Sequence, residues 1–317
     1  MRAAILLCSA WAIGCAGERR DGGSATTVTS VATTAPSAES GGSESSSADD
    51  SSGGSTGVAS TSATTEPSTH SGSSSTTGSS DAGDDTTTGG PIGLPSLGSL
   101  VVLGDSISDG GGQPPYYYAL LRDDLDAHYG GIEYVNNAES GSETGDLLGQ
   151  VNGLPDALPG PVAVVITSGG NDMKSAIQQI VIGADGPART AMQGHVAAAL
   201  DALLAPNRFG AGVEVFVFEG NIYDASDGAG DFGAHDCAFG GGLPAIPTDP
   251  IFENWNSALA ETIADKGQTS VDMHAWFYGH GYASAPSWYA GDCTHPSTVG
   301  HEELQKLFHW HITGETI

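Results

Sequence analysis

Basic residues and long apolar runs are both scarce in this chain. Its 317 residues include 9 Lys and Arg against 38 Asp and Glu, which gives a formal net charge of −29 at pH 7. A protein that grips nucleic-acid phosphates or anionic lipid headgroups needs a basic face, so the charge excludes both kinds of partner. No apolar run reaches the ~18 residues of a membrane-spanning helix, which excludes a polytopic membrane protein. The four cysteines lack zinc-site spacing and are too few for a disulfide-scaffold mini-protein.

Aromatic residues are absent over a long stretch, between Trp11 and Tyr116. Within that stretch, residues 21–90 contain 20 Ser, 15 Thr and 12 Gly. This composition buries too little apolar surface to offset the entropy of ordering, so we predict that residues 15–94 form a disordered, flexible tether. Residues 95–317 hold 28 acidic and 6 basic residues and are long enough for one domain with a substantial core.

The first residues have the pattern of an export signal. Arg2 precedes an apolar run over residues 3–14, which has the length of a signal-peptide core and is too short to span a bilayer. The run ends in Ala-Ile-Gly before Cys15, which resembles a bacterial lipobox. The resemblance implies that residues 1–14 are removed and that lipidated Cys15 is the only membrane attachment of a lipoprotein exported to the outer membrane or cell surface. An ordinary secretory peptide with an incidental cysteine is the alternative.

The remainder of the chain alternates strand and helix patterns. Short apolar runs predict strands at 100–103, 132–135, 162–167 and 213–218, and a fifth strand that begins at Val271. Helical patterns cover 116–128, 175–182, 188–204, 252–264 and 302–311. The alternation predicts an α/β fold, a three-layer α/β/α sandwich with a five-stranded parallel sheet of the flavodoxin-like kind. In such folds ligands bind at the carboxyl ends of the strands.

Polar motifs follow the first three predicted strands and precede the last predicted helix. They are Gly-Asp-Ser-Ile-Ser at 104–108, Asn-Ala-Glu-Ser-Gly at 137–141, Ser-Gly-Gly-Asn-Asp at 168–172 and Asp-Cys-Thr-His-Pro at 292–296. Together these motifs resemble those of the SGNH (GDSL) hydrolases, which are named for a serine, a glycine, an asparagine and a histidine. The resemblance extends over residues 97–313 and implies the α/β/α fold of that family. Four motifs in family order are far more specific than a Gly-Asp-Ser tripeptide alone.

A serine hydroxyl is a weak nucleophile and needs a base to take its proton. Ser106 follows a predicted strand on a tight turn, and we predict that His295 is its base. Asp292 lies on the same loop, where its carboxylate can fix the tautomer of the imidazole. The family resemblance assigns the oxyanion hole to the backbone N–H groups of Ser106 and Gly141 and to the side-chain amide of Asn171. We expect glycine at 141 because the lack of a Cβ permits close backbone approach.

Other polar residues of these motifs have structural interpretations. Asn171 can instead cap the following helix, since asparagine is a common N-cap residue. Its flanking residues Gly170 and Asp172 favour the oxyanion role, and we expect Asp172 itself to be structural. We expect Asp105 to hydrogen-bond the turn, and His301, at the start of the last predicted helix, to make a local hydrogen bond.

Three further groups of residues have competing interpretations. Four aspartates lie in the Gly-rich loop 224–236, and a calcium site is one interpretation of this cluster. Their spacing does not fit an EF-hand loop, so we predict no metal site. Trp288 and Tyr289 suit the core or a pocket wall equally. His309 and His311 do not share a helix face, so we expect surface or partly buried side chains and no metal ligands.

These motifs predict an enzyme that hydrolyses carboxylic esters through an acyl-serine intermediate, with no cofactor. The predicted substrate is a small-molecule or glycan ester, either an acyl lipid or an acetylated polysaccharide, and we expect a monomer that binds no nucleic acid. The rival hypothesis is a catalytically silent lipoprotein that uses the same fold to bind a ligand at the cell surface.

The remaining two cysteines predict a disulfide. Cys8 lies in the predicted signal peptide and Cys15 carries the predicted lipid, which leaves Cys237 and Cys293 in an exported, oxidised domain. The first lies in the segment after the fourth predicted strand and the second in the loop of the predicted base, so both are expected at one rim of the pocket. Two free, buried thiols are the alternative.

Overall fold

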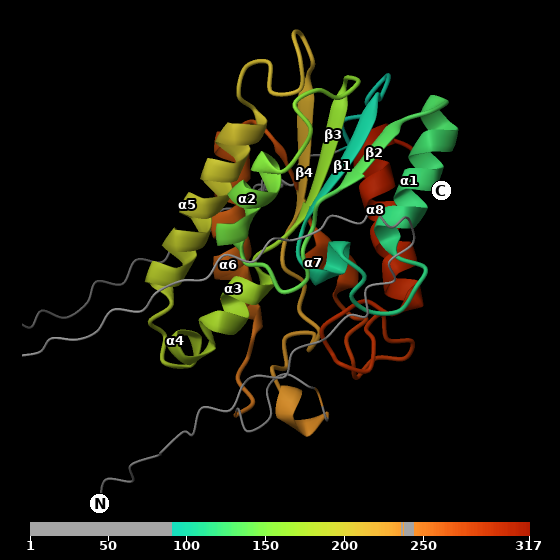
Figure 1. Cartoon of the computed structure of the whole chain (residues 1–317). Helices are drawn as coiled ribbons and strands as arrows, with labels where there is room; N and C mark the ends of the chain where they lie inside the picture. Colours follow the sequence, from blue (N-terminus) through green and yellow to red (C-terminus); the bar gives the residue numbers. More distant parts are fainter. Residues whose placement is uncertain (1–90, 236, 238–243) are drawn as a thin grey trace, which may run out of the picture. The chain divides into compact units, whose positions relative to one another are not determined.

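A five-stranded parallel sheet forms the centre of the described chain (Figure 1). The computed structural model describes residues 91–235, 237 and 244–317. Its strands lie in the order β2-β1-β3-β4-β5, and every neighbouring pair is parallel. Their bounds are Ser99–Gly104 (β1), Glu133–Asn136 (β2), Val162–Thr167 (β3), Val215–Gly220 (β4) and Thr269–Val271 (β5). The predicted α/β fold with a five-stranded parallel sheet is confirmed.

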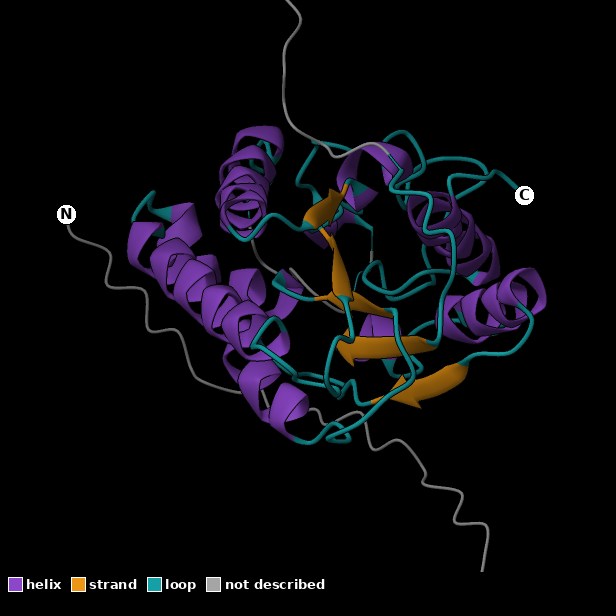
Figure 2. Cartoon of the chain, turned by 90° about the horizontal axis from the view of Figure 1, so that it is seen from above, coloured by secondary structure: helices purple, strands orange, loops and turns teal. Residues whose placement is uncertain are grey.

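Helices cover both faces of the sheet, as Figure 2 shows from above. One face packs against α1 (Tyr117–Tyr129), α7 (Met273–Phe277) and α8 (Thr298–Thr313). The other packs against α2 (Leu147–Asn152), α3 (Gly170–Ser175), α4 (Ile177–Val181), α5 (Gly186–Leu203) and α6 (Asp249–Asp265).

The central strands divide their side chains between these two helical layers. Val101 and Leu103 of β1 lie in the cluster with α5 and α6, and Leu100 and Val102 lie in the cluster with α1 and α8. All four are 0% exposed, because successive residues of a strand point to opposite faces and both faces are covered. Burial of each such side chain contributes about 1.5–3 kcal/mol. The polar motifs found in the sequence therefore lie in the loops at the strand ends.

Several element boundaries differ from the sequence prediction. The predicted helix 175–182 is two helices, one from Gly170 and one from Ile177, with a break at Ala176. The sequence does not reveal α2 or α7, because so few turns show little periodicity. The fifth strand ends at Val271 instead of beginning there, since two buried polar residues precede it in the ladder.

The segment before residue 95 contacts the last helix. The N–H of Ile92 donates to His311 O (3.0 Å) and the N–H of Leu94 donates to Ile312 O (2.8 Å). The predicted signal peptide, Cys15 and the tether up to residue 90 lie outside the described residues, so the division of the chain into these parts stays a prediction. Among the helices of the described residues, none has the length and apolar character needed to cross a membrane.

Candidate active site

The turn after β1 presents Ser106. The strand ends at Gly104, and the 3₁₀ turn Ser106–Ser108 follows at once. Asp105 stabilises this turn, because its carboxylate accepts hydrogen bonds from Ile107 N (3.0 Å) and Thr167 Oγ1 (3.2 Å). Burial raises the pKa of Asp105 to about 6, against the lowering effect of these hydrogen bonds. The expected structural role of this aspartate agrees with these contacts.

Ser106, His295 and Asp292 lie in one line of hydrogen bonds. Ser106 Oγ is 2.8 Å from His295 Nε2, and His295 Nδ1 is 2.6 Å from Asp292 Oδ2. The other oxygen of the carboxylate accepts from the backbone N–H of His295 and of Thr294, both at 3.0 Å. Partial burial raises the pKa of Asp292, but these bonds from His295 and Thr294 outweigh it and lower the pKa to about 2. The carboxylate therefore stays charged next to the imidazole at neutral pH.

The three predicted oxyanion donors have unused N–H groups. Within the described part of the chain, the backbone N–H groups of Ser106 and Gly141 have no acceptor. The side-chain amide of Asn171 donates one hydrogen to Ser142 O (2.9 Å) and keeps the other. Asn171 is not the N-cap of α3, since Gly169 occupies that position, so the capping alternative is wrong.

No neighbouring protein atom requires glycine at 141, since a Cβ there would meet no heavy atom within 4 Å. The close approach expected between this backbone and the oxyanion of a substrate stays a prediction. The φ angle of +85° does favour glycine, because L-residues with side chains are strained in that region.

A glycine loop that the sequence analysis missed lies between the nucleophile and the base. Gly111 N donates to Ser106 O (2.6 Å), and a Cβ at Gly111 would lie 2.5 Å from His295 Cδ2. His301 Nε2 donates to Gly111 O (2.9 Å), while its Nδ1 accepts from Tyr117 N (3.3 Å). The expected local hydrogen bond of His301 is therefore wrong. Burial lowers the pKa of His301 to about 4, so the ring stays neutral and fixes this loop.

Hydrogen bonds link the loops after β2 and β3 to each other and to the turn after β1. Asp172 accepts hydrogen bonds from Thr144 N (2.9 Å) and Thr144 Oγ1 (2.5 Å), in keeping with its expected structural role. Ser140 N donates to Asp109 Oδ2 (2.9 Å). These bonds fix the strand-end loops that carry Gly141 and Asn171.

Comparison with known proteins decides the family. The family model of the GDSL-like lipases and acylhydrolases matches residues 102–303. The chain belongs to this family. Membership makes it an ester hydrolase of the GDSL type and confirms the resemblance seen in the four motifs.

Solved structures of similar fold include several ester hydrolases. Phospholipase A1 from Streptomyces albidoflavus NA297 is 22% identical, with a TM-score of 0.52 over 67% of this chain and 98% of that one. An acetylxylan esterase from Geobacillus stearothermophilus is 21% identical, with a TM-score of 0.49 over 69% and 97% of the two chains. An extracellular lipase from Streptomyces rimosus is 23% identical, with a TM-score of 0.44 over 67% and 98%. Among curated proteins, no match is found.

Hydrogen bonds hold the acidic loop of this GDSL hydrolase. Asp224 accepts from the backbone of its own loop, and Asp227 accepts from Gly279 N (3.0 Å) and Gly281 N (2.8 Å). Asp231 accepts from Tyr282 Oη (2.5 Å). Asp236 lies outside the described residues. Within the described ranges, no group of His, Cys, Asp or Glu is arranged to hold a metal ion.

Two further expectations concern aromatic and histidine side chains of the hydrolase. Tyr289 is buried against Tyr223 and does not line the cavity next to Ser106 and His295, which assigns it to the core and not to a pocket wall. Trp288 also lies outside the cavity lining. His309 and His311 are both 3% exposed, so the expectation of surface or partly buried side chains is wrong. Both are buried because α8 packs over much of its surface.

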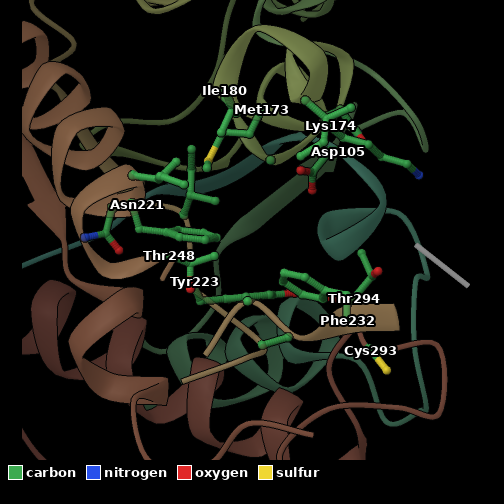
Figure 3. Close-up of a pocket in the computed structure, with 18 of the residues that line it drawn as sticks. Asp105, Met173, Lys174, Ile180, Asn221, Tyr223, Phe232, Thr248, Cys293 and Thr294 are labelled. Carbon is green, nitrogen blue, oxygen red and sulfur yellow. The ribbon is translucent and has the colours of Figure 1, made fainter. Parts of the chain in front are cut away.

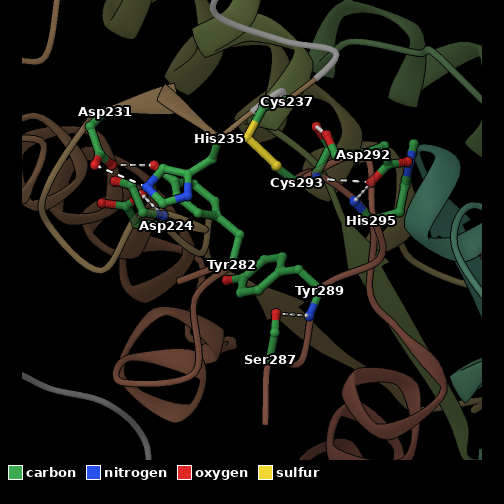
Figure 4. The surroundings of a disulfide bond; sticks show 12 residues. Asp224, Asp231, His235, Cys237, Tyr282, Ser287, Tyr289, Asp292, Cys293 and His295 are labelled. Atoms are coloured by element: carbon green, nitrogen blue, oxygen red, sulfur yellow. Dashed lines mark hydrogen bonds and ion pairs between the residues drawn. A yellow bond between two sulfur atoms is a disulfide. The ribbon is translucent and has the colours of Figure 1, made fainter. Parts of the chain in front are cut away.

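The predicted disulfide between Cys237 and Cys293 is present (Figure 4). It joins residues 56 positions apart. Cys293 lies directly between Asp292 and Thr294, so the bridge ties the loop of the base to the segment after β4. Both cysteines are buried.

Reduction of this disulfide is expected to lower kcat about 3- to 30-fold before the sheet unfolds, because small displacements of a base are costly. Loop entropy predicts a loss of up to about 4 kcal/mol in the free energy of unfolding. Ester hydrolysis and far-UV circular dichroism, followed together against reductant concentration, measure both effects. The double variant Cys237→Ser/Cys293→Ser is the control. Its kcat should equal that of the reduced enzyme and should not change when reductant is added. An unchanged kcat in the reduced, folded enzyme would contradict the prediction.

A buried carboxyl group below the site was not found by sequence analysis. Glu219 of β4 is 0% exposed and accepts from Ser168 Oγ (2.9 Å), while its second oxygen has no hydrogen-bond partner among the described residues. Burial, with a smaller contribution from the charge of Asp172, raises the pKa of Glu219 to about 8. Glu219 therefore stays protonated in the folded enzyme at neutral pH. Glu219 belongs to a strand whose other residues are mostly apolar and to none of the four motifs, so the motifs do not identify it.

Glu219→Gln is expected to stabilise the enzyme at pH 7–8 by about 1–3 kcal/mol. An unfolded chain ionises this carboxyl near pH 4.5, whereas the folded chain retains the proton up to about pH 8, so stability falls with pH between these values. The variant lacks that slope, which is at most about 1.4 kcal/mol per pH unit. Urea unfolding at pH 4.5, 6 and 8 measures it. The exposed Glu214, changed to Gln, serves as the control. Parallel pH profiles of Glu219→Gln and the natural enzyme would refute this account.

Proposed function

We propose that this hydrolase cleaves carboxylic esters with Ser106 as nucleophile, His295 as general base and Asp292 as the group that orients the imidazole. The observation that carries the proposal is the continuous line of hydrogen bonds, 2.8 Å from Ser106 Oγ to His295 Nε2 and 2.6 Å from His295 Nδ1 to Asp292 Oδ2. Such a line activates a hydroxyl at neutral pH.

The reaction proceeds in two halves. Ser106 Oγ attacks the ester carbonyl carbon as its proton passes to His295 Nε2, and the negative oxygen faces the N–H groups of Ser106, Gly141 and Asn171. The imidazolium then protonates the alcohol oxygen, the ester C–O bond breaks, and an acyl-serine remains. Water attacks this acyl group with its proton taken by His295, and the carboxylic acid leaves as Ser106 regains its hydrogen. The charge of Asp292 stabilises the imidazolium in both halves.

A fluorophosphonate probe tests this assignment directly. The natural enzyme is expected to be labelled at Ser106 and to hydrolyse p-nitrophenyl esters, because both reactions need an activated hydroxyl. Ser106→Ala is expected to lose both while retaining its circular dichroism spectrum. Absence of labelling and of hydrolysis in the natural enzyme would instead favour the silent binding protein. Peptide mapping that places the label on another residue would overturn the role of Ser106.

The proposal includes attachment to the cell surface through a lipid on Cys15. It is supported by the lipobox-like sequence and by the Ser, Thr and Gly content of residues 21–90. As a flexible coil, residues 16–94 would hold the enzyme roughly 50 Å from the anchor. Cys15→Ser is expected to move the protein from the membrane fraction to the soluble fraction, and its continued sedimentation with membranes would refute the anchor. An acyl lipid and an acetylated glycan are the two substrate classes that suit this location.

A further inference from the structure

Figure 3 shows a cavity of about 150 Å³. Its lining includes both Ser106 and His295. Its apolar wall comes from α3, α4, the loop after β4 and α6, and includes Met173, Ile177, Ile180, Ile222, Ile251 and Phe252. In Figure 3, Met173 and Ile180 lie across the cavity from Thr294 and Cys293. The site therefore has an aliphatic side and a side formed by the loop of the base.

Three polar side chains of this wall, those of Asn221, Thr248 and Ser168, are already engaged within the protein, whereas Lys174 of α3 is exposed. Asn221 donates from Nδ2 to Asp272 Oδ1 (2.8 Å) and accepts at Oδ1 from His274 N (2.7 Å). Thr248 Oγ1 donates to Asp224, and Ser168 Oγ donates to Glu219. A sugar placed against this wall would lose the water around its hydroxyl groups and find few new partners, which is costly. An aliphatic chain has no hydrogen bonds with water to lose when it binds there.

The geometry of the reaction places the acyl group on the aliphatic side. The alcohol oxygen of the ester must lie near His295 Nε2, which protonates it, and the carbonyl oxygen must face Asn171. The third substituent of the carbonyl carbon, which is the acyl chain, then points away from His295. Asn171 belongs to the first turn of α3, and the next cavity-lining residues along the chain are Met173, Lys174 and Ile177. The acyl chain thus meets α3 first and α4 next.

We propose that the enzyme prefers esters of unbranched aliphatic acids several methylenes longer than acetate, with the acyl chain bound between α4 and Ile222. The proposal rests on the proposed function and selects the acyl lipid over the acetylated glycan. An acetyl group ends beside Asn171 and leaves the wall formed by Ile177 and Ile180 without contact. A longer chain covers this wall and releases its water, which favours the transition state of acylation as well as binding.

A series of p-nitrophenyl esters with two to twelve acyl carbons, used below their micellar concentrations, tests the preference. The leaving group is constant, so differences in kcat/KM report the acyl site. Each methylene that becomes buried is expected to raise kcat/KM about fourfold, until the cavity is filled. A maximum at acetate, or a flat profile, would overturn the inference while hydrolysis itself leaves the proposed function standing. An enzyme that neither hydrolyses any member nor labels at Ser106 would overturn both.

Matched substitutions on α4 locate the chain. Ile180 is 8% exposed and lines the cavity, so Ile180→Trp should shift the optimum to shorter esters and lower the ratio of the long-chain to the acetate kcat/KM at least tenfold. Ile182 is 76% exposed and outside the lining, and Ile182→Trp is the control that should leave the ratio unchanged. Val181→Trp, at a lining position that is 39% exposed, gives a second test if the first variant unfolds. Unchanged ratios in folded Ile180→Trp or Val181→Trp would place the acyl chain elsewhere and refute the proposal.

Discussion

Replacing His295 with alanine is expected to lower kcat for ester hydrolysis by about four to six orders of magnitude. Without this side chain no group lies 2.8 Å from Ser106 Oγ to take its proton, and no acid protonates the leaving alcohol. The ring is 22% exposed and belongs to neither hydrophobic cluster, so the domain should remain folded. Steady-state kinetics on the best ester, with circular dichroism as the folding control, measure the effect.

Two further variants test whether Ser106, His295 and Asp292 act as one catalytic unit or contribute to kcat independently. Asp292→Ala is expected to retain about 10- to 100-fold more activity than His295→Ala, because the carboxylate orients and stabilises the imidazole without exchanging protons with substrate. The double variant Ser106→Ala/His295→Ala should lose little more than either single variant, since the two groups act as a unit. A kcat within tenfold of the natural value in His295→Ala would contradict the assignment of the base.

The sequence contains enough information to predict the residues that stand at the strand ends. Branched apolar runs mark β1 to β4, and a polar motif follows each of β1, β2 and β3, so the parallel-sheet rule places Ser106, Gly141 and Asn171 at one edge. The disulfide could be predicted with the same rule, because Cys237 follows the fourth predicted strand and Cys293 lies in the loop of the predicted base. These inferences depend on local patterns and on one topological rule, which the structure obeys.

Contacts that arise only from the tertiary fold could not be predicted from local patterns. Gly111 and His301 are 190 positions apart, and nothing in either local sequence indicates that the ring fixes the glycine loop between Ser106 and His295. Three consecutive glycines at 110–112 were the available signal, since such a run often marks a close backbone approach. The burial of Glu219 could not be predicted, because a single acidic residue in a strand is usually exposed at the edge of the sheet, and only the tertiary fold shows that this one is covered.

Gly104→Ala is expected to cost more than about 4 kcal/mol in the free energy of unfolding. The residue has a φ of +118°, and a Cβ there would lie 2.0 Å from the backbone oxygen of Thr167 on the neighbouring strand. That oxygen also accepts the N–H of Asp105 (2.9 Å), so it cannot move aside without opening the turn that presents Ser106. The clash therefore destabilises the sheet and displaces the nucleophile together.

A matched glycine isolates the effect of this backbone position. Gly194 lies within α5, where a Cβ would meet no heavy atom within 4 Å, so Gly194→Ala should stabilise the protein by about 0.5–1 kcal/mol through its helix propensity. Urea unfolding of both variants, followed by circular dichroism, measures the two changes in the free energy of unfolding, which are expected to have opposite signs. The yield of folded Gly104→Ala is expected to fall. An unfolding midpoint of Gly104→Ala equal to that of the natural enzyme would mean that the β1–β3 junction can widen. Ser106 would then be held by the Asp105 turn and the Gly111 loop rather than by the tight approach of the two strands.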